Sequence, residues 1–586
     1  MKKKFIQKKW IRMDEKKGDA ASLSTVTAGL PPAIRSILSQ RGLVDEEQIK
    51  KFLNPTLMDL PSPFLMKGMK DAVALVYQAM QENSAVVIYG DYDVDGVTGS
   101  AVLALFLKEI GLDVTCYQPD RFSKGYGLHA DAIRDLHRQV SRKDEEKKHL
   151  LISVDCGISN VEEVAVAKER GFSVIIADHH QPPEQLPEAD SILNPHQHGC
   201  TFPDKDLAGV GVAFYLIMGL RSHLREKGVW QGREAPNLKE YLDLVALGTV
   251  CDMVSLSGVN RILVKAGLEV LQHRQRPGLK ALADVSGLEA GRKITSEDIG
   301  FRLGPRLNAA GRIGASERAL ELLTTEDYNT SISLANELDA ENRKRKELTE
   351  DIFHQAAEKA KELIETGRKT LVVSGEGWHP GVLGIVASRL VHQFYRPTIV
   401  LSRENETAKG SCRSVSCLNI YEALLECDQL DRFGGHAMAA GVTLQTQNIN
   451  AFADQFEAYV ASQISPDDLV PTLNINMDSS CEELNDTIFL NCYEKLQPFG
   501  IGNPEPVFAF RNCTLNKTRL VGTNHMKFTY QENGCRLEGI GFGFGSCIAD
   551  VSKHAVDLAF ALRLNSFNGR ETWQANLLDL KVAASP

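Results

Sequence analysis

The chain has 586 residues, of which 43% are hydrophobic and 24% charged, with a formal net charge of -10 and an isoelectric point near 5.9. This length predicts several domains, and the composition excludes disordered, collagen-like and membrane-embedded classes of protein. Because the overall charge is negative, any contact with a polyanion must come from a local group of residues.

The first 80 residues predict a helical N-terminal lead. Apolar residues recur at helical spacing between Ile34 and Leu53, and prolines interrupt that pattern. Residues 1–10 carry five lysines but lack the apolar core of a signal peptide. The twelve cysteines form no C-x-x-C pair, which is typical of buried thiols in a reducing compartment. We therefore expect a cytoplasmic protein that makes no contact with a membrane.

Residues 81–324 predict an α/β domain with a parallel sheet. Strand-like and helix-like segments alternate along this part of the chain, and such alternation is typical of a parallel sheet covered by helices. The predicted strands are 85–89, 113–118, 150–154 and 173–177, and the predicted helices are 97–110 and 161–170.

A long helix is expected over residues 325–368, which are rich in Ala, Glu, Lys and Leu and contain no proline. Residues 369–464 predict a second α/β domain, with strands at 370–374 and 398–402 and a helix at 384–395. The Ser-Pro-Asp-Asp stretch at 465–468 then predicts a linker.

Residues 465–586 predict a small antiparallel β-barrel. Five strand-like runs lie between 507 and 578, and Asn-Gly turns are expected at 533–534 and 568–569. The aromatics of this region could stack on nucleic-acid bases or fill the interior of the barrel, and the sequence leaves both readings open.

Aspartates and histidines follow three of the predicted parallel strands. Asp91, Asp93 and Asp95 follow the first strand, Asp155 follows the third, and Asp178-His179-His180 follows the fourth. Asp252 follows a further apolar run, 244–250, and could join them. Since the carboxyl ends of parallel strands meet at one edge of a sheet, we expect these side chains to lie close together.

This group predicts a metal site. Carboxylates at such short range would repel one another unless cations neutralised them, and oxygen and nitrogen ligands suit Mg²⁺ or Mn²⁺. A single Asp after a strand is more often a helix N-cap, so the prediction rests on the whole set. Calcium in an EF-hand is excluded, because the twelfth position of that loop would be Val102.

Two further loops carry residues that could bind a ligand. Residues 121–129 combine Arg121, Lys124 and His129 with two glycines, so the loop could contact phosphate or could simply be solvated. His196, His198 and Cys200 stand in a proline-flanked stretch without a companion ligand pair, and we interpret that stretch as an ordinary loop.

With these motifs in hand, the sequence resembles the DHH phosphoesterase superfamily, and later motifs narrow the resemblance to RecJ-type single-stranded-DNA-specific exonucleases. The later motifs are Pro-Arg-Leu-Asn-Ala-Ala-Gly-Arg at 305–312, Gly-Gly-His-Ala-Met-Ala-Ala-Gly at 434–441 and the segment 497–506. The resemblance implies a catalytic DHH domain, a connecting helix, a DHH-associated domain and an oligonucleotide-binding (OB-like) barrel. It covers about residues 85–510.

The resemblance also implies roles for individual residues. Two Mn²⁺ or Mg²⁺ ions per site would be held by acidic and histidine side chains, Asp155 and His180 would be catalytic, and a further set would contact phosphate or DNA. The implied metal residues are Asp91, Asp93, Asp95, Asp155, Asp178, His179 and Asp252. The implied phosphate or DNA residues are Arg121, His129, Arg306, Asn308, Ser411, Arg413, Gly434, Gly435 and His436.

The activity implied is metal-dependent 5′-to-3′ hydrolysis of single-stranded DNA to 5′-mononucleotides, in repair and recombination. The partners implied are a single-strand-binding protein and a helicase, around a monomeric enzyme. Tyr89 stands where many members of the superfamily have a histidine, so the ligands of the first metal stay open. The alternatives are a phosphodiesterase for nanoRNA, pAp or cyclic dinucleotides, and an inactive replication scaffold.

Overall fold

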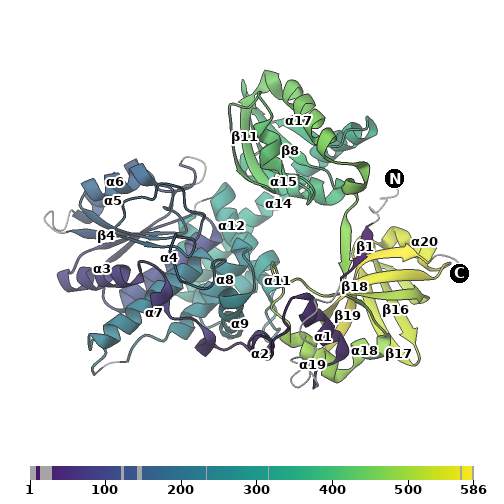
Figure 1. Cartoon of the computed structure of the whole chain (residues 1–586), viewed down its shortest axis with the longest axis horizontal. Helices are drawn as coiled ribbons and strands as arrows, with labels where there is room; N and C mark the ends of the chain where they lie inside the picture. The colour runs from purple at the N-terminus through teal and green to yellow at the C-terminus, as the bar shows by residue number, and fades with distance from the viewer. Residues whose placement is uncertain are drawn as a thin grey trace. The chain divides into compact units, whose positions relative to one another are not determined.

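The computed structural model describes residues 8–13, 29–120, 124–141, 148–232, 234–314, 316–567 and 570–583 (Figure 1). The chain divides into two compact units, which we describe separately. The central unit comprises Asp45–Asn342 with Tyr493–Glu505, and the terminal unit comprises Met1–Val44, Arg343–Cys492 and Pro506–Pro586. None of the described helices combines the length and apolarity that crossing a bilayer requires.

A five-stranded parallel sheet forms the core of the central unit, as predicted. Its strands are β2 (Val86–Gly90), β3 (Val114–Tyr117), β4 (His149–Val154), β5 (Phe172–Ala177) and β6 (Ser191–Leu193). Their order in space is β3-β2-β4-β5-β6, so the direction of winding reverses between β2 and β4. Only β6 was not predicted, because three residues give no periodic signal.

Helices cover both faces of this sheet. Helices α3 (Met69–Glu82), α4 (Val94–Glu109) and α7 (Gly209–Glu226) pack on one face, and α5 (Ala130–Ser141) and α6 (Val161–Glu169) pack on the other. Alternate residues of each strand enter the two apolar clusters, as a sheet buried on both faces requires. The predicted α/β architecture is confirmed.

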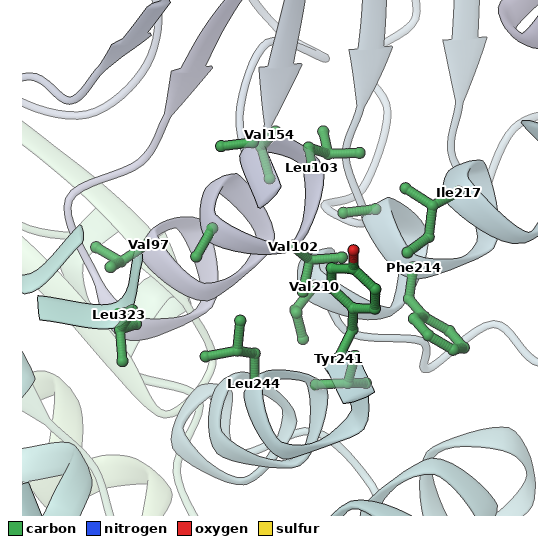
Figure 2. Packing of buried hydrophobic residues seen from close by; sticks show 14 of the residues in the cluster. Val97, Val102, Leu103, Val154, Val210, Phe214, Ile217, Tyr241, Leu244 and Leu323 are labelled. Atoms are coloured by element: carbon green, nitrogen blue, oxygen red, sulfur yellow. The ribbon is translucent and has the colours of Figure 1, made fainter. Parts of the chain in front are cut away.

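Helix α4 lies at the centre of the larger cluster. Figure 2 shows its residues Val97, Val102 and Leu103 between Val154 of the sheet and Leu244 of α8 (Leu242–Asp252). Because α4 is surrounded by the sheet, α7 and α8, nearly all of its residues are buried. The residues at its N-terminal end are therefore rigidly held.

The rest of the central unit is helical. It comprises α2 (Glu46–Leu53), η2 (Leu57–Asp59), η3 (Pro63–Leu65), η4 (Leu238–Tyr241), α9 (Gly258–Gln272), α10 (Pro277–Val285), α11 (Ser296–Asp298), the π-helical turn η5 (Ile299–Leu303), α12 (Gly304–Ile313) and α13 (Glu317–Thr324). The long helix α14 (Tyr328–Glu365) begins in this unit and agrees with the helix predicted over 325–368.

The segment Tyr493–Glu505 returns to the central unit from the C-terminal part of the chain. The guanidinium of Arg261 on α9, only 2% exposed, donates hydrogen bonds to the carbonyls of Lys495, Leu496 and Gln497 at 2.9–3.1 Å. It also donates to the carbonyl of Phe52. One buried side chain therefore holds the start of the 497–506 motif.

A five-stranded sheet of order β10-β11-β9-β8-β7 forms one part of the terminal unit. Its strands are β7 (Leu371–Glu376), β8 (Thr398–Glu404), β9 (Thr407–Arg413), β10 (Arg432–His436) and β11 (Ala439–Gln445). Helix α15 (Pro380–Phe394) packs on one face with the end of α14, and α16 (Ile420–Leu425) and α17 (Ile449–Gln463) pack on the other. The predicted linker at 465–468 contains the start of a short 3₁₀ turn, η7 (Pro466–Leu469).

The C-terminal part holds a seven-stranded sheet of order β13-β14-β18-β19-β17-β16-β15. Its strands are β13 (Met477–Asp478), β14 (Val507–Cys513), β15 (Leu515–Val521), β16 (His525–Glu532), β17 (Cys535–Gly541), β18 (Val556–Phe567) and β19 (Arg570–Val582). Short helices α18 (Cys481–Asn485), α19 (Thr487–Lys495) and α20 (Ile548–Val551) accompany it.

This sheet is mostly antiparallel, as predicted, but the β13–β14 and β17–β19 pairs are parallel. The turn at Asn533-Gly534 is present, with φ of 48° and 81°, and the turn predicted at 568–569 lies outside the described residues. Phe528, Tyr530 and Phe544 are buried, so these aromatics fill the interior.

The N-terminal lead contains an unexpected strand. Helix α1 (Pro32–Gln40) and α2 confirm the helical prediction, but β1 (Lys9–Arg12) pairs in parallel with β12 (Thr472–Ile475). The indole Nε1 of Trp10 donates a 2.7 Å hydrogen bond to Asp579 on β19. The first and the last of the described strands thus lie in the same unit.

Candidate metal centre

Acidic side chains gather where the central sheet reverses its winding. Asp91 and Asp93 follow β2, and Asp155 follows β4, the strand beside it. The loops that leave two such neighbouring strands diverge, which opens a crevice at the carboxyl ends of the strands. A cavity of about 320 Å³ lies there. It is lined by Asp91, Tyr92, Asp93, Tyr126, Asp155, His180, Cys251, Asp252, Asn308, Gly311 and Arg312.

Asp155 occupies a strained and buried position. Its backbone has a φ of 60° and the residue is 2% exposed. A Cβ atom placed on Gly209, the first residue of α7, would lie 2.9 Å from the Asp155 carboxylate. Gly209 therefore leaves the space that this carboxylate needs, and the left-handed conformation aims it into the cavity.

Asp95 and Asp93 are held by backbone N–H groups. Both oxygens of Asp95 accept hydrogen bonds from the start of α7, from the N–H of Gly209 at 2.7 Å and of Val210 at 2.8 Å. Asp93 Oδ1 caps α4 by accepting from Asp95 and Gly96. Asp93 is therefore a helix N-cap, as is usual for an Asp at such a position, and it also lines the cavity.

His179 presents a lone pair to three carboxylates. Its Nε2 lies 3.1 Å from Asp155 Oδ1, 3.7 Å from Asp252 Oδ2 and 3.9 Å from Asp95 Oδ2. Burial, together with the neighbouring His180, lowers the pKa of His179 to about 4, so the ring is neutral. Nε2 makes no hydrogen bond among the described residues, as expected of the unprotonated nitrogen of a neutral ring.

The donor atoms of the site fit a cation. Among the buried atoms without a hydrogen-bond partner in the described part of the chain, four belong to this site: Asp91 Oδ1, Asp155 Oδ1, His179 Nε2 and Asp252 Oδ2. Buried polar atoms without partners are costly, and a lone pair beside carboxylate oxygens is repulsive unless a cation lies between them. Three overlapping groups have donor atoms within 4.8 Å of one another: Asp91-Asp93-Asp155, Asp95-His179-Asp252 and Asp155-His179-His180.

The electrostatics of these carboxyl groups agree with this fit. Burial and the adjacent Asp93 raise the pKa of Asp91 to about 8 and that of Asp252 to about 7. The pKa values of Asp95 and Asp155 also lie well above the usual range because of burial and neighbouring carboxylates. Carboxyl groups crowded in this way need either protons or cations.

Asp178 and His180 form a hydrogen-bonded pair beside the cavity. Asp178 accepts from the N–H groups of His179 and His180, from His180 Nδ1 at 2.7 Å and from the N–H of Ile158. Burial alone would raise the pKa of Asp178, but the bonds from His180 outweigh it and the pKa falls. The Asp178 oxygens are thus occupied, and Asp178 belongs to none of the three donor groups. The hydroxyl of Tyr126 lies 3.0 Å from His180 Nδ1.

Four residues of the central unit were predicted to contact phosphate, and their surroundings differ. Asn308 lines the cavity, whereas Arg306 does not, because its guanidinium binds Asp339 at 2.9 Å. Both ring nitrogens of His129 lie 2.6 Å from backbone carbonyls, of Leu128 and Lys124. Arg121 lies outside the described residues.

In the terminal unit, four predicted residues share one face of the sheet. One row across strands β10, β11 and β9 consists of Gly434, Gly441 and Ser411. The row two residues further along consists of His436, Ala439 and Arg413, and it lies on the same face because side chains alternate along a strand. Arg413 also donates to Ser411 Oγ at 3.1 Å. Gly435, with a φ of 146°, lies in the intervening row. Gly434 and His436 are exposed.

The sequence prediction missed five residues that line the cavity: Tyr92, Tyr126, Cys251, Gly311 and Arg312. Gly311 and Arg312 end the 305–312 motif, so helical spacing from Asn308 was an available signal. Asp252 was correctly placed near the other acids, although the apolar run before it is helix α8 and Asp252 is the last residue of that helix. A helix interior and a buried strand have the same composition over seven residues.

Three family models match the chain. The DHH family N-terminal domain matches residues 85–249, the DHHA1 domain matches 367–462, and the RecJ OB domain matches 475–579. Together these models span the central sheet, the five-stranded sheet of the terminal unit and the C-terminal sheet.

Similar proteins are found at nearly full length. The single-stranded-DNA-specific exonuclease RecJ of Bacillus subtilis is 36% identical over 581 residues, which are 98% of this chain and 71% of the relative. RecJ of Escherichia coli is 36% identical over 93% of this chain and 95% of the relative. The crystal structure of Thermus thermophilus RecJ with Mn²⁺ matches 98% of this chain and 80% of that chain, with a TM-score of 0.81 and 30% identity. The Mg²⁺ complex matches with a TM-score of 0.72 and 28% identity, over 98% of this chain and 79% of that chain.

Proposed function

The chain belongs to the RecJ family, and we propose that it is a metal-dependent exonuclease that hydrolyses single-stranded DNA from the 5′ end to 5′-mononucleotides. The observation that carries this proposal is the group of four unpartnered donor atoms around a cavity that Arg312 and Asn308 also line. A metal-binding group beside hydrogen-bond donors is an arrangement suited to metal-assisted phosphodiester hydrolysis.

Six residues would hold two Mn²⁺ or Mg²⁺ ions: Asp91, Asp93, Asp95, Asp155, His179 and Asp252. When bound, such ions supply Lewis acidity and lower the pKa of a coordinated water. Asp155 belongs to two of the three donor groups, which supports a bridging role for it. The bonds that occupy Asp178 support a positioning role, in which Asp178 orients His180.

The residues around the ions would then bind the substrate. Asn308 and Arg312 donate hydrogen bonds to the phosphate that is attacked, and they stabilise the charge that develops on its oxygens. The bond to Asp178 Oδ1 and the charge of that carboxylate raise the pKa of His180 in spite of burial. His180 is therefore suited to give a proton from Nε2 to the leaving oxygen, as a general acid.

The terminal unit would bind the DNA strand. Ser411, Arg413, Gly434, Gly435 and His436 are proposed to contact its phosphates, and the shared sheet face of four of them supports this. We also propose that the chain divides into five parts, namely 1–80, 81–324, 325–368, 369–464 and 465–586. We further propose that the enzyme is monomeric and cytoplasmic, that it acts in repair and recombination, and that its partners are a single-strand-binding protein and a helicase.

One experiment tests the proposal directly. Single-stranded oligonucleotides labelled at the 5′ or the 3′ end are incubated with the protein and Mn²⁺. Release of a labelled mononucleotide from the 5′-labelled strand, and a ladder of shortening products from the 3′-labelled strand, are expected. A duplex of the same sequence should resist cleavage. Equal cleavage of the duplex, or mononucleotide release from the 3′ label first, would refute the proposal.

A further inference from the structure

Phe301 is the most exposed aromatic side chain in the described part of the chain, at 76%. A large apolar ring in water is unfavourable, although single exposed apolar residues are common on protein surfaces. The position of Phe301 therefore decides whether its exposure has a function.

Phe301 lies on an element that leads into the wall of the cavity. It belongs to the π-helical turn η5, which continues directly into α12, and three residues of α12 line the cavity, Asn308, Gly311 and Arg312. A π-helical turn is rare and is frequently found at functional sites. Phe301 precedes Asn308 by seven residues, a rise of about 10 Å along a helix.

Two contacts bring η5 close to the cavity. A Cβ atom placed on Gly304, which follows η5 directly, would lie 2.3 Å from Sγ of Cys251, a residue that lines the cavity. The turn η5 also packs against α8, the helix that ends at Asp252. Directly after Asp252, Met253 has a φ of 65° and is 67% exposed. Two exposed apolar side chains thus stand next to chain segments that line the cavity, since Met253 follows Asp252 and η5 leads into α12.

The size of the cavity makes an outside contact necessary for a strand. A volume of about 320 Å³ accommodates little more than one nucleotide, so the bases that follow must lie beyond the cavity wall. Every base has an apolar face, and stacking on an aromatic ring is indifferent to sequence. An enzyme that removes each nucleotide in turn needs a contact of that kind.

We propose that Phe301, together with Met253, forms the surface on which a base of the single strand stacks next to the cavity. This inference rests on the proposed function and specifies how that function recognises its substrate. It assigns Phe301 to substrate binding and gives it no part in the chemical step.

The test pairs a substitution in the protein with a deletion in the DNA. Phe301→Ala is made in an Asp155→Asn background, which should slow cleavage at least about 100-fold, and affinity is measured by fluorescence anisotropy with Mn²⁺ present. The substrates are an intact single strand and a series of strands that each lack one base. Phe301→Ala should weaken binding of the intact strand about tenfold. The loss should vanish for the strand that lacks the base stacked on Phe301, and Phe301→Trp should retain affinity.

Met58→Ala is the matched control, since Met58 is 95% exposed in the same unit and does not line the cavity. Its affinity for the strand should be unchanged. Binding that is unaffected by Phe301→Ala, or a loss that is equal for every abasic strand, would overturn this inference alone. A parent protein that neither binds nor cleaves single strands would overturn the proposed function as well.

Discussion

His179 Nε2 and Asp155 Oδ1 approach to 3.1 Å without forming a hydrogen bond, and neither atom has a hydrogen-bond partner elsewhere among the described residues. The two residues follow neighbouring strands, β5 and β4. A lone pair therefore faces a carboxylate oxygen at the carboxyl edge of the sheet. This contact becomes favourable when a cation lies between the two atoms.

Asp155→Asn should reduce nuclease activity by at least about 100-fold, because the amide removes a carboxylate that two donor groups share. The same variant should raise the thermal unfolding temperature of the metal-free protein, since it removes one of several crowded buried acids. Product release and differential scanning fluorimetry measure the two effects. Activity within tenfold of the parent protein would contradict the bridging role.

Treatment with EDTA should abolish activity, and either Mn²⁺ or Mg²⁺ should restore it, because five of the six proposed ligand residues are aspartates. Ca²⁺ provides a control for nonspecific charge neutralisation, since it binds oxygen ligands without matching the geometry of the smaller ions. Cleavage that continues at full rate in EDTA would exclude a metal mechanism.

The affinity for Mn²⁺ should rise with pH by about tenfold per unit between roughly pH 6 and 7, because a bound ion must displace protons. Asp91 and Asp252 carry the effect, with pKa values raised to about 8 and about 7 by burial and by Asp93. Titration calorimetry in two buffers of different ionisation enthalpy counts the protons released. An affinity independent of pH would show that these groups are already ionised.

The stability of the metal-free protein should move in the opposite direction. A carboxyl group whose pKa is raised in the folded state binds more protons in the folded than in the unfolded protein. The stability that this group contributes is therefore present at low pH and is lost as the pH rises through the pKa of the folded state. For Asp91 and Asp252 that loss extends to about pH 8 and about pH 7. The unfolding temperature without metal should therefore fall from pH 6 to pH 8, and saturating Mn²⁺ should remove the fall.

Arg261→Met should destabilise the protein by about 3 kcal/mol or more, because four backbone carbonyls lose the guanidinium donor, although that of Leu496 keeps another, Asn503 Nδ2. Hydrogen exchange should show faster opening of Tyr493–Glu505. Arg261→Lys should not restore stability, since an ammonium cannot reach the same set of acceptors. Arg170→Ala, at an exposed position, is the control. Unchanged exchange of the segment in Arg261→Met would show that other contacts hold it.

Arg413→Ala and His436→Ala should lower the rate of cleavage while leaving Mn²⁺ affinity unchanged, because both residues lie on a sheet face of the terminal unit and the metal ligands lie in the central unit. Initial rates and calorimetric titration are measured on the same preparations. A variant that binds less Mn²⁺ would contradict this separation of roles.

Local patterns were sufficient to predict the acidic group at the sheet edge. Asp91, Asp155 and Asp178 each come directly after a short apolar run. The alternation of strands and helices along the chain predicted that these runs are parallel strands of one sheet. The chemistry of the edge therefore followed from topology. The patterns could not show which way each side chain points. The carboxylate of Asp178 binds His180, and the guanidinium of Arg306 binds Asp339.

Contacts between distant parts of the sequence were not predictable. Strand β1 has four residues, two of them charged, and its pairing partner β12 lies near the other end of the chain, so nothing local identifies it. Arg261 looked like any helical arginine, because the carbonyls that it binds are more than 200 residues away. Exposure of Phe301 likewise depends on packing that a single sequence does not contain.

The pairing of β1 with β12 has a consequence for synthesis of the protein on the ribosome. Thr472 is added about 460 residues after Lys9, which at about 5–20 residues per second is a delay of roughly 20 to 90 seconds. Asp579, the hydrogen-bond partner of Trp10, is added later still. During that interval the first strand has an unpaired edge, and a nascent chain with such an edge can associate with neighbouring chains or with a chaperone.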